Sequence, residues 1–236
     1  MKIAVVSFYY YVDNYWCNHD MLDEYCEMHG YDLHYNIKQV KDSSIHEPTY
    51  DGMVYMRELL DKGYDRVFWF DGSDIIITNF SMKLEDMIGD KPIQFSNDVL
   101  PSYPIDSYGC NSGFWSVDSS DISKQFLDDV LETYDPDYHH GWNKTYWGDQ
   151  DILNTISVDY KDHLDTDCLH QSYWFYNSSE FYSMGILEQL EYFSNQGKNV
   201  NTYKLGDFLI HFAGGVVTTR TMTEVFERLR KVIEGK

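Results

Sequence analysis

Two carboxylates stand in one short polar segment that directly follows an apolar run. Residues 67–70 lead into Asp71-Gly72-Ser73-Asp74. Gly72 permits a sharp turn, and two carboxylates that face one cleft repel each other unless a proton or a divalent cation lies between them. Oxygen ligands of this kind suit Mg²⁺ or Mn²⁺. The turn alone is equally consistent with a purely structural role, in which the carboxylates only cap it.

A histidine and two glycines end a second apolar run near the C-terminus. Residues 208–211 continue into Phe212-Ala213-Gly214-Gly215. An imidazole at a strand end can bind a metal ion, and the backbone amides of glycines can approach a diphosphate closely. A single histidine in an apolar run is more often a core residue, so His211 gains significance only if it meets the acidic turn in space.

Two further polar motifs lie at the ends of expected elements. Asn111-Ser112-Gly113 begins a strand-like run, and Asp149-Gln150 begins a helical one. Helix and strand ends attract polar residues for capping alone, so each motif has a structural explanation as well as a functional one.

Aromatic residues gather in the aperiodic stretch 135–147, which we expect to be a loop. Trp142, Tyr146 and Trp147 lie there. Aromatic planes pack against the apolar faces of sugar rings, but they also fill loops. Acceptor binding and simple packing therefore both remain open for Trp142 and Trp147.

The elements that must position these residues follow from hydrophobic periodicity. The first part of the chain predicts strand, helix, strand, helix, strand, over residues 3–8, 14–28, 31–37, 50–62 and 66–70. This order implies a parallel sheet with crossover helices, whose ligands bind at the carboxyl ends of the strands. Later elements are expected as strands at 92–96, 113–117 and 208–211 and as helices at 119–134, 149–156 and from about 223. We predict one α/β domain over residues 1–236.

Composition excludes several classes of function. The net charge of −21 argues against a nucleic acid or an anionic membrane as the main partner. An aromatic content of 17% excludes a disordered chain, and no run approaches the ~20 apolar residues of a membrane span. Four cysteines without CxxC spacing indicate free thiols in a reducing compartment. These features predict a cytoplasmic protein.

Other enzyme classes lack their signature motifs in this chain. The sequence contains no phosphate-binding P-loop, no His-Glu-x-x-His and no Gly-x-Ser-x-Gly. A phosphatase or nucleotidyltransferase with an Asp-x-Asp turn would need a carboxylate where Ser73 stands. A non-catalytic carbohydrate-binding module remains an alternative, because it too would use aromatic rings and acidic turns.

Taken in order, the motifs at 68–79, 111–113, 148–150 and 211–214 resemble one family. They are similar to GT-A-type glycosyltransferases, and closest to the family of galactosyl-, mannosyl- and xyloglucan xylosyltransferases. The Asp-x-x-Asp spacing, in place of the usual Asp-x-Asp (DXD) motif, is nearer to that of collagen glucosyltransferases. The likeness covers about residues 2–215, and includes the expected first helix and second strand.

The resemblance implies a fold and a reaction. The fold would be a GT-A-like (Rossmann-like) domain with a mostly parallel central sheet flanked by helices. The reaction would be metal-dependent transfer of a hexosyl or pentosyl group from a nucleoside-diphosphate donor, such as a UDP-sugar, to a hydroxyl of a glycan or glycoprotein. The family resemblance favours retention of the anomeric configuration.

The same resemblance assigns roles to residues of this chain. Mn²⁺ or Mg²⁺ would be held by Asp71, Asp74 and His211. Gln150 would lie below the anomeric carbon, and Asp149 is its rival, since a carboxylate one residue away could act as nucleophile. Trp142 and Trp147 are expected to contact the acceptor because of their aromatic rings, independently of the resemblance. The donor would contact Phe8, Tyr9, Asp71, Gly72, Ser73, Asn111, Gly113, Gly214 and Gly215.

Two departures from the family pattern matter. The family usually carries a lysine soon after His-Phe-Ala-Gly, whereas Gly215-Val216-Val217 follows here and Arg220 is the nearest cation. Eukaryotic members also carry an N-terminal membrane anchor, which this sequence does not show. We therefore expect a cytoplasmic protein of a bacterium, or of a virus or phage in its host cell.

Overall fold

The computed structural model describes residues 1–10, 19–38, 46–72, 75–97, 109–133, 149–166, 169, 171–173 and 206–211. Several predicted features lie outside this part of the chain: the expected loop with Trp142 and Trp147, the expected C-terminal helix, and Ser73, Asp74, Gly214 and Gly215. No helix among the described residues has both the length and the apolar character needed to cross a bilayer.

A six-stranded sheet forms the centre, in the order β2-β1-β3-β6-β5-β7. Its strands are β1 (Ile3–Tyr10), β2 (Asp32–Lys38), β3 (Arg66–Phe70), β5 (Ile93–Asn97), β6 (Cys110–Asp118) and β7 (Leu164–Asp165). β6 pairs antiparallel with both β3 and β5, whereas the other pairs are parallel. The sheet is therefore mostly parallel, as the sequence predicted.

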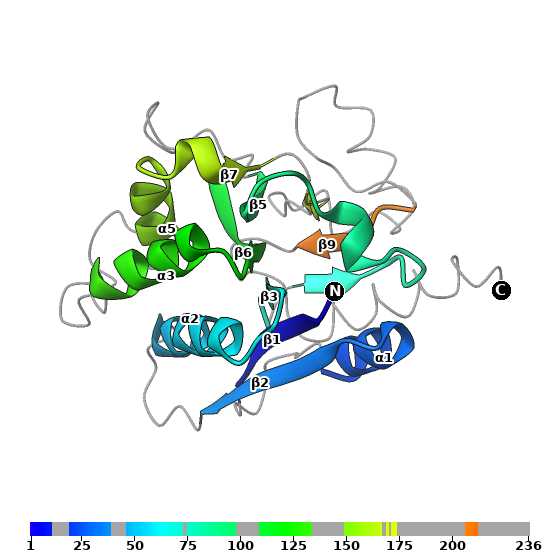
Figure 1. Ribbon diagram of the computed structural model, residues 1–236. Helices are drawn as coiled ribbons and strands as arrows, with labels where there is room; N and C mark the ends of the chain where they lie inside the picture. The colour runs from blue at the N-terminus through cyan, green and yellow to red at the C-terminus, as the bar shows by residue number, and fades with distance from the viewer. Residues whose placement is uncertain are drawn as a thin grey trace, which may run out of the picture.

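Helices cover both faces of this sheet (Figure 1). They are α1 (His19–His29), α2 (His46–Asp61), α3 (Asp121–Thr133) and α5 (Asp149–Ser157), with short 3-10 turns at Leu84–Met87 and Lys161–His163. α2, α3 and α5 pack on one face, and α1 packs on the other.

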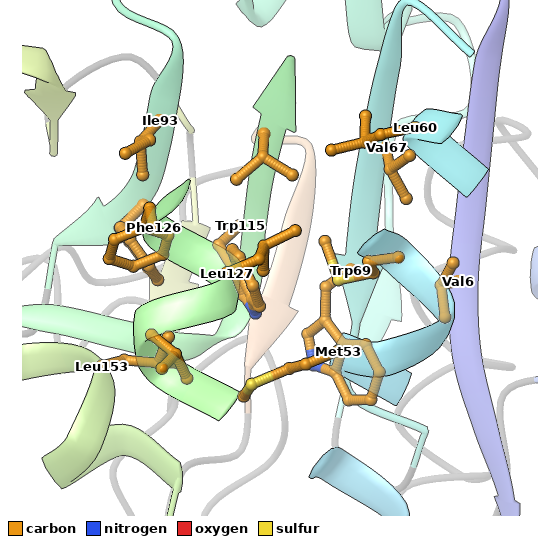
Figure 2. Packing of buried hydrophobic residues seen from close by; sticks show 14 of the residues in the cluster. Val6, Met53, Leu60, Val67, Trp69, Ile93, Trp115, Phe126, Leu127 and Leu153 are labelled. Atoms are coloured by element: carbon orange, nitrogen blue, oxygen red, sulfur yellow. The ribbon is translucent and has the colours of Figure 1, made fainter. Parts of the chain in front are cut away.

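Alternation along the strands creates the two hydrophobic layers. In β3, Phe68 and Phe70 join the layer under α1, while Val67 and Trp69 join the layer under α2, α3 and α5. Figure 2 shows the second layer, with Trp69 among its buried side chains. A Cβ on Gly52 of α2 would overlap the ring of Trp69, so this glycine lets the helix approach the sheet closely.

A second, three-stranded sheet carries the histidine that the sequence singled out. Its order is β4 (Ile75–Ile77), β9 (Leu209–His211) and β8 (Gln171–Tyr173). β4 and β9 pair antiparallel, with Ile75 opposite His211. The sequence did not predict β4 or β8, because three-residue strands are too short to show a period.

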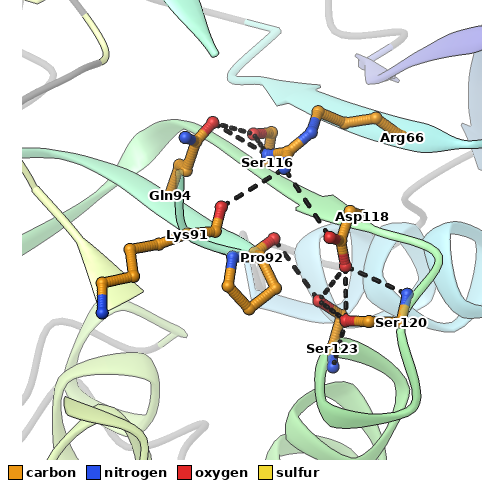
Figure 3. Close-up of polar contacts among 8 residues, drawn as sticks. All are labelled: Arg66, Lys91, Pro92, Gln94, Ser116, Asp118, Ser120 and Ser123. Carbon is orange, nitrogen blue, oxygen red and sulfur yellow. Dashed lines mark hydrogen bonds and ion pairs between the residues drawn. The ribbon is translucent and has the colours of Figure 1, made fainter. Parts of the chain in front are cut away.

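A buried polar network lies at the amino end of β3, away from the acidic turn (Figure 3). The Arg66 guanidinium donates to Gln94 Oε1 at 2.8 Å and to Ser116 Oγ at 2.9 Å. Asp118 lies 3.9 Å from the same guanidinium and accepts hydrogen bonds from Ser120 and Ser123 at the start of α3. The network fixes the end of β6 and the start of α3 relative to β3.

Most expected elements are present, with shifted ends. β6 begins at Cys110 rather than at 113, so Asn111 and Ser112 belong to the strand. α2 begins at His46, four residues before the expected start, because Pro48 is tolerated in a first helical turn. Cys26 and Cys110 are buried free thiols, as predicted, and Cys17 and Cys168 lie outside the described residues.

Candidate functional site around Gly113

Gly113, near the start of β6, is hydrogen-bonded to the residue that follows β3. The Asp71 backbone N–H donates to the Gly113 carbonyl oxygen at 2.8 Å, one step beyond the paired Phe70 and Phe114. Gly72, which follows Asp71, is buried. The acidic turn thus leaves β3 directly beside the Asn111-Ser112-Gly113 motif.

The imidazole of His211 lies against the same glycine. An ideal Cβ built on Gly113 would stand 2.5 Å from His211 Cε1 and 2.9 Å from Nδ1. His211 is buried, and its backbone in β9 pairs with Ile75 of β4, the residue after Asp74. Residues 71 and 211 therefore meet at Gly113 although 140 positions separate them in the sequence (211 − 71).

The backbone around β9 is anchored at the exit of β4. Thr78 Oγ1 donates to the Asp207 carbonyl oxygen at 2.7 Å, and Asn79 Nδ2 donates to the Gly206 carbonyl oxygen at 2.8 Å. Gly206 adopts a φ of 105°, which is strained for any other residue. These contacts fix the chain just before the strand that presents His211.

Gln150 crosses from the first turn of α5 to β6. Its side-chain oxygen accepts hydrogen bonds from Asn111 Nδ2 and from the Ser112 backbone N–H, each at 3.1 Å. A backbone N–H can only donate, so the oxygen of the Gln150 amide must face β6. Asn111 Oδ1 in turn accepts from the Gly113 N–H at 2.9 Å, which links Gln150 through Asn111 to Gly113.

Asn154 holds the same helix one turn later. Its side chain accepts from the Cys110 N–H and donates to the Cys110 carbonyl oxygen, both at 2.8 Å, as a neighbouring strand would. It also donates to the Gln150 carbonyl oxygen at 2.9 Å. Sequence reasoning missed this residue; the available signal was a polar residue directly after the apolar pair Ile152-Leu153 in the expected helix.

Asp149 occupies the start of α5, beside the polar chain. Burial raises the pKa of its carboxyl to about 6, although hydrogen bonds from Ser112 and from the backbone N–H groups of residues 149 and 150 lower it, and the nearby Asp151 charge raises it further. A carboxyl with this pKa changes charge close to neutral pH. It is therefore better suited to moving a proton than an ordinary aspartate would be.

The structure brings six of the predicted site residues close together, while the roles assigned to all of the site residues stay predictions. The six that meet are Asp71, Asn111, Gly113, Asp149, Gln150 and His211. Phe8 and Tyr9 lie on β1, which runs parallel to β3, but only their backbone is described. Ser73, Asp74, Trp142, Trp147, Gly214 and Gly215 lie outside the described residues.

The described part of the chain contains no cluster of three His, Cys, Asp or Glu side chains close enough to hold a metal ion. Asp74, the third expected ligand, is not part of it. The two expected ligands that are described, Asp71 and His211, offer an oxygen and a nitrogen donor, a combination that Mn²⁺ accepts. Their meeting at a residue without a side chain is compatible with a metal site there.

Comparison with known proteins identifies structural relatives only. No protein-family model matches the chain, and no curated protein matches its sequence. One similar solved structure is a glycosyltransferase involved in the glycosylation of the major capsid of PBCV-1, at 13% identity and a TM-score of 0.60, covering 98% of this chain and 100% of that one. Another is the galactosyltransferase LgtC in complex with donor and acceptor sugar analogs, at 13% identity and a TM-score of 0.51, covering 96% of this chain and 94% of that one.

These likenesses extend over nearly the whole length of each protein. The mostly parallel central sheet flanked by helices is the architecture that the sequence motifs predicted. The chain therefore has the GT-A-like α/β fold of these glycosyltransferases.

Proposed function

We propose that this protein is a metal-dependent glycosyltransferase that moves a sugar from a nucleoside-diphosphate donor, such as a UDP-sugar, to a hydroxyl group of a glycan or glycoprotein. The observation that carries the proposal is the convergence at Gly113 of the acidic turn, His211 and the Asn111–Gln150 pair. Sequence-distant residues that meet at the carboxyl end of a sheet form a site where ligands of this fold class bind.

The proposed division of labour follows from the chemistry of each group. Asp71 and His211, with Asp74, would hold Mn²⁺ or Mg²⁺. Such a cation, when bound, offsets the negative charge that develops on a departing diphosphate. In a protein of net charge −21, no general positive field is available for that purpose.

Asn111 and the Asp149-Gln150 pair would face the transferred sugar. The oxygen of Gln150 already accepts two N–H groups of β6, which reduces its capacity to stabilise positive charge on a sugar ring. This gives Gln150 a second role, which is to hold Asn111 and Ser112 in place. It also gives Asp149 more weight as the group that acts at the anomeric carbon, where a carboxylate nucleophile would produce retention through a covalent intermediate.

The test is a panel of nucleotide sugars with Mn²⁺, assayed for released nucleoside diphosphate. Turnover that requires both the metal and an acceptor supports the proposal. Sugar binding without release of nucleotide would instead favour a carbohydrate-binding module. Proton NMR of the first product formed from an α-linked donor decides between retention and inversion.

A further inference from the structure

We infer that Gly113 is a positioning residue: the absence of a side chain at this position is what allows the His211 imidazole to lie against β6 at the residue to which the Asp71 backbone is bonded. The contact between Gly113 and the His211 ring is a matter of packing. Only its use for binding a donor and its cation rests on the function proposed above.

The backbone does not require glycine at this position. Gly113 lies within β6, and its φ is not in the positive range that favours glycine. Its N–H and C=O make ordinary bonds to Asn111 Oδ1 and to the Asp71 N–H. Glycine inside a strand weakens that strand, because it loses more conformational freedom on folding and packs no side chain. A close approach by another group is the usual reason for one.

That approaching group is the histidine ring. The three atoms nearest to an added Cβ would be His211 Cε1 at 2.5 Å, His211 Nδ1 at 2.9 Å and Asn111 Oδ1 at 3.0 Å. All three belong to side chains of the candidate site. An alanine at position 113 would therefore press on two site residues at once.

The ring has little freedom to move away. His211 is 5% exposed, and its backbone is paired on both sides, with Ile75 of β4 and with Tyr173 of β8. The hydrogen bonds from Thr78 and Asn79 fix the chain just before β9. A methyl group at position 113 would have to turn the imidazole, which displaces Nδ1.

A double-mutant cycle tests the contact between Gly113 and His211 without any assay of activity. Gly113→Ala, His211→Ala and the double variant are unfolded in urea, and their free energies of unfolding are compared. We expect Gly113→Ala to destabilise the protein when His211 is present and to cost much less when the ring is absent. An equal loss in both backgrounds would overturn the inference.

The cycle stays decisive if Gly113→Ala fails to fold. If the double variant then folds, the two substitutions are coupled, and the inference is supported. Failure of both variants contradicts the inference, because removing the ring would have made no room for the methyl group. Gly52→Ala, which crowds Trp69 on the other face of the sheet, is the matched control and should show no coupling to His211→Ala.

Two further readouts separate positioning from a general loss of stability. The NMR signal of the His211 Cε1–H should shift in Gly113→Ala and stay unchanged in Gly52→Ala. Titration with Mn²⁺ in the presence of UDP should show affinity weakened on the order of 10-fold or more in Gly113→Ala, as for changes that reorient a metal ligand. A wild-type protein that binds no Mn²⁺ would contradict the proposed function. The unfolding cycle would still show whether Gly113 makes room for the His211 ring.

Discussion

The side-chain amide of Asn111 donates to the carbonyl oxygen of Gln150 at 3.1 Å, so the only acceptor atom of the Gln150 side chain is directed at β6. The Ser112 backbone N–H shares the same oxygen at 3.1 Å. A glutamine expected to act on a sugar thus also connects helix α5 to the strand that carries Asn111 and Gly113. This double role can be separated by mutation.

We expect Gln150→Ala to lower turnover about 10²-fold, on the scale of one lost electrostatic donor or acceptor. Gln150→Glu keeps an oxygen that accepts from Asn111 and Ser112, so it should recover activity to within about tenfold of wild type if accepting those bonds is the main role. Steady-state release of nucleoside diphosphate measures both. Equal loss in the two variants would show that the amide N–H₂ of Gln150 contacts the substrate.

The expected metal ligands make a second prediction. Asp71→Asn, Asp74→Asn and His211→Ala should each abolish Mn²⁺-supported turnover and weaken binding of Mn²⁺ with UDP, as measured by calorimetry. The two aspartate variants should remain folded, because removing one of two facing carboxylates relieves repulsion. Asp90→Asn, a change at an exposed position, is the control. Unchanged binding in all three variants would leave the acidic turn with only a structural role.

Asn154→Asp should misalign α5 while keeping the shape of the side chain. The carboxylate cannot donate to the carbonyl oxygens of Cys110 and Gln150, so each of these oxygens loses its side-chain donor. We expect a loss of about 1–3 kcal/mol in the free energy of unfolding and a fall in turnover at temperatures where the variant is fully folded. Ser157→Ala, a buried change one turn later in the same helix, should leave turnover near wild type.

Asp149 makes stability depend on pH. Burial raises the pKa of its carboxyl to about 6 from the usual 3.8, so the folded state holds this proton more tightly than the unfolded state does. The protein should therefore lose stability as the pH rises from about 4 through about 6, by about 2 kcal/mol after allowance for solvent screening. Asp149→Asn should remove this dependence in urea unfolding at several pH values. An identical pH profile in the variant would show that the carboxyl titrates normally.

Arg66 offers a test of stability that spares the site. Its guanidinium is buried, with Gln94, Ser116 and Asp118 around it at the amino end of β3. Arg66→Ala removes the hydrogen bonds that hold the side chains of Gln94 and Ser116 and should cost about 1–3 kcal/mol in thermal or urea unfolding. Metal and nucleotide affinity of the folded fraction should stay unchanged, because Asp71 leaves the opposite end of the same strand. A matching loss of affinity would show that the two ends are coupled.

The sequence predicted those features that depend on local pattern. The apolar runs of β1 and β3 are buried on both faces, which is why the strand and helix order could be read correctly. The ordered motifs also indicated that Asp71 and His211 would converge. The sequence could not predict that they meet at Gly113, because this depends on the pairing of β4 with β9 and on the space that the glycine leaves.

Other parts of the site depend on contacts that leave no periodic signal. Asn154 acts through two backbone atoms of Cys110, which lies 44 positions away. The antiparallel direction of β6 was likewise not predicted, because a strand's direction is set by its neighbours and leaves no trace in its own apolar pattern. The expected ligand Asp74 and the aromatic acceptor contacts stay predictions, because they lie outside the described residues.

The pairing of β4 with β9 also bears on the order in which the chain folds. Thr78 bonds to a residue 129 positions further along, whereas β1, β2 and β3 pair within the first 70 residues. Closing so long a loop costs entropy that nearer pairings do not, so contacts of this separation form late. During synthesis the central sheet can begin to assemble long before residue 211 leaves the ribosome. His211 is therefore expected to reach Gly113 in one of the last steps of folding.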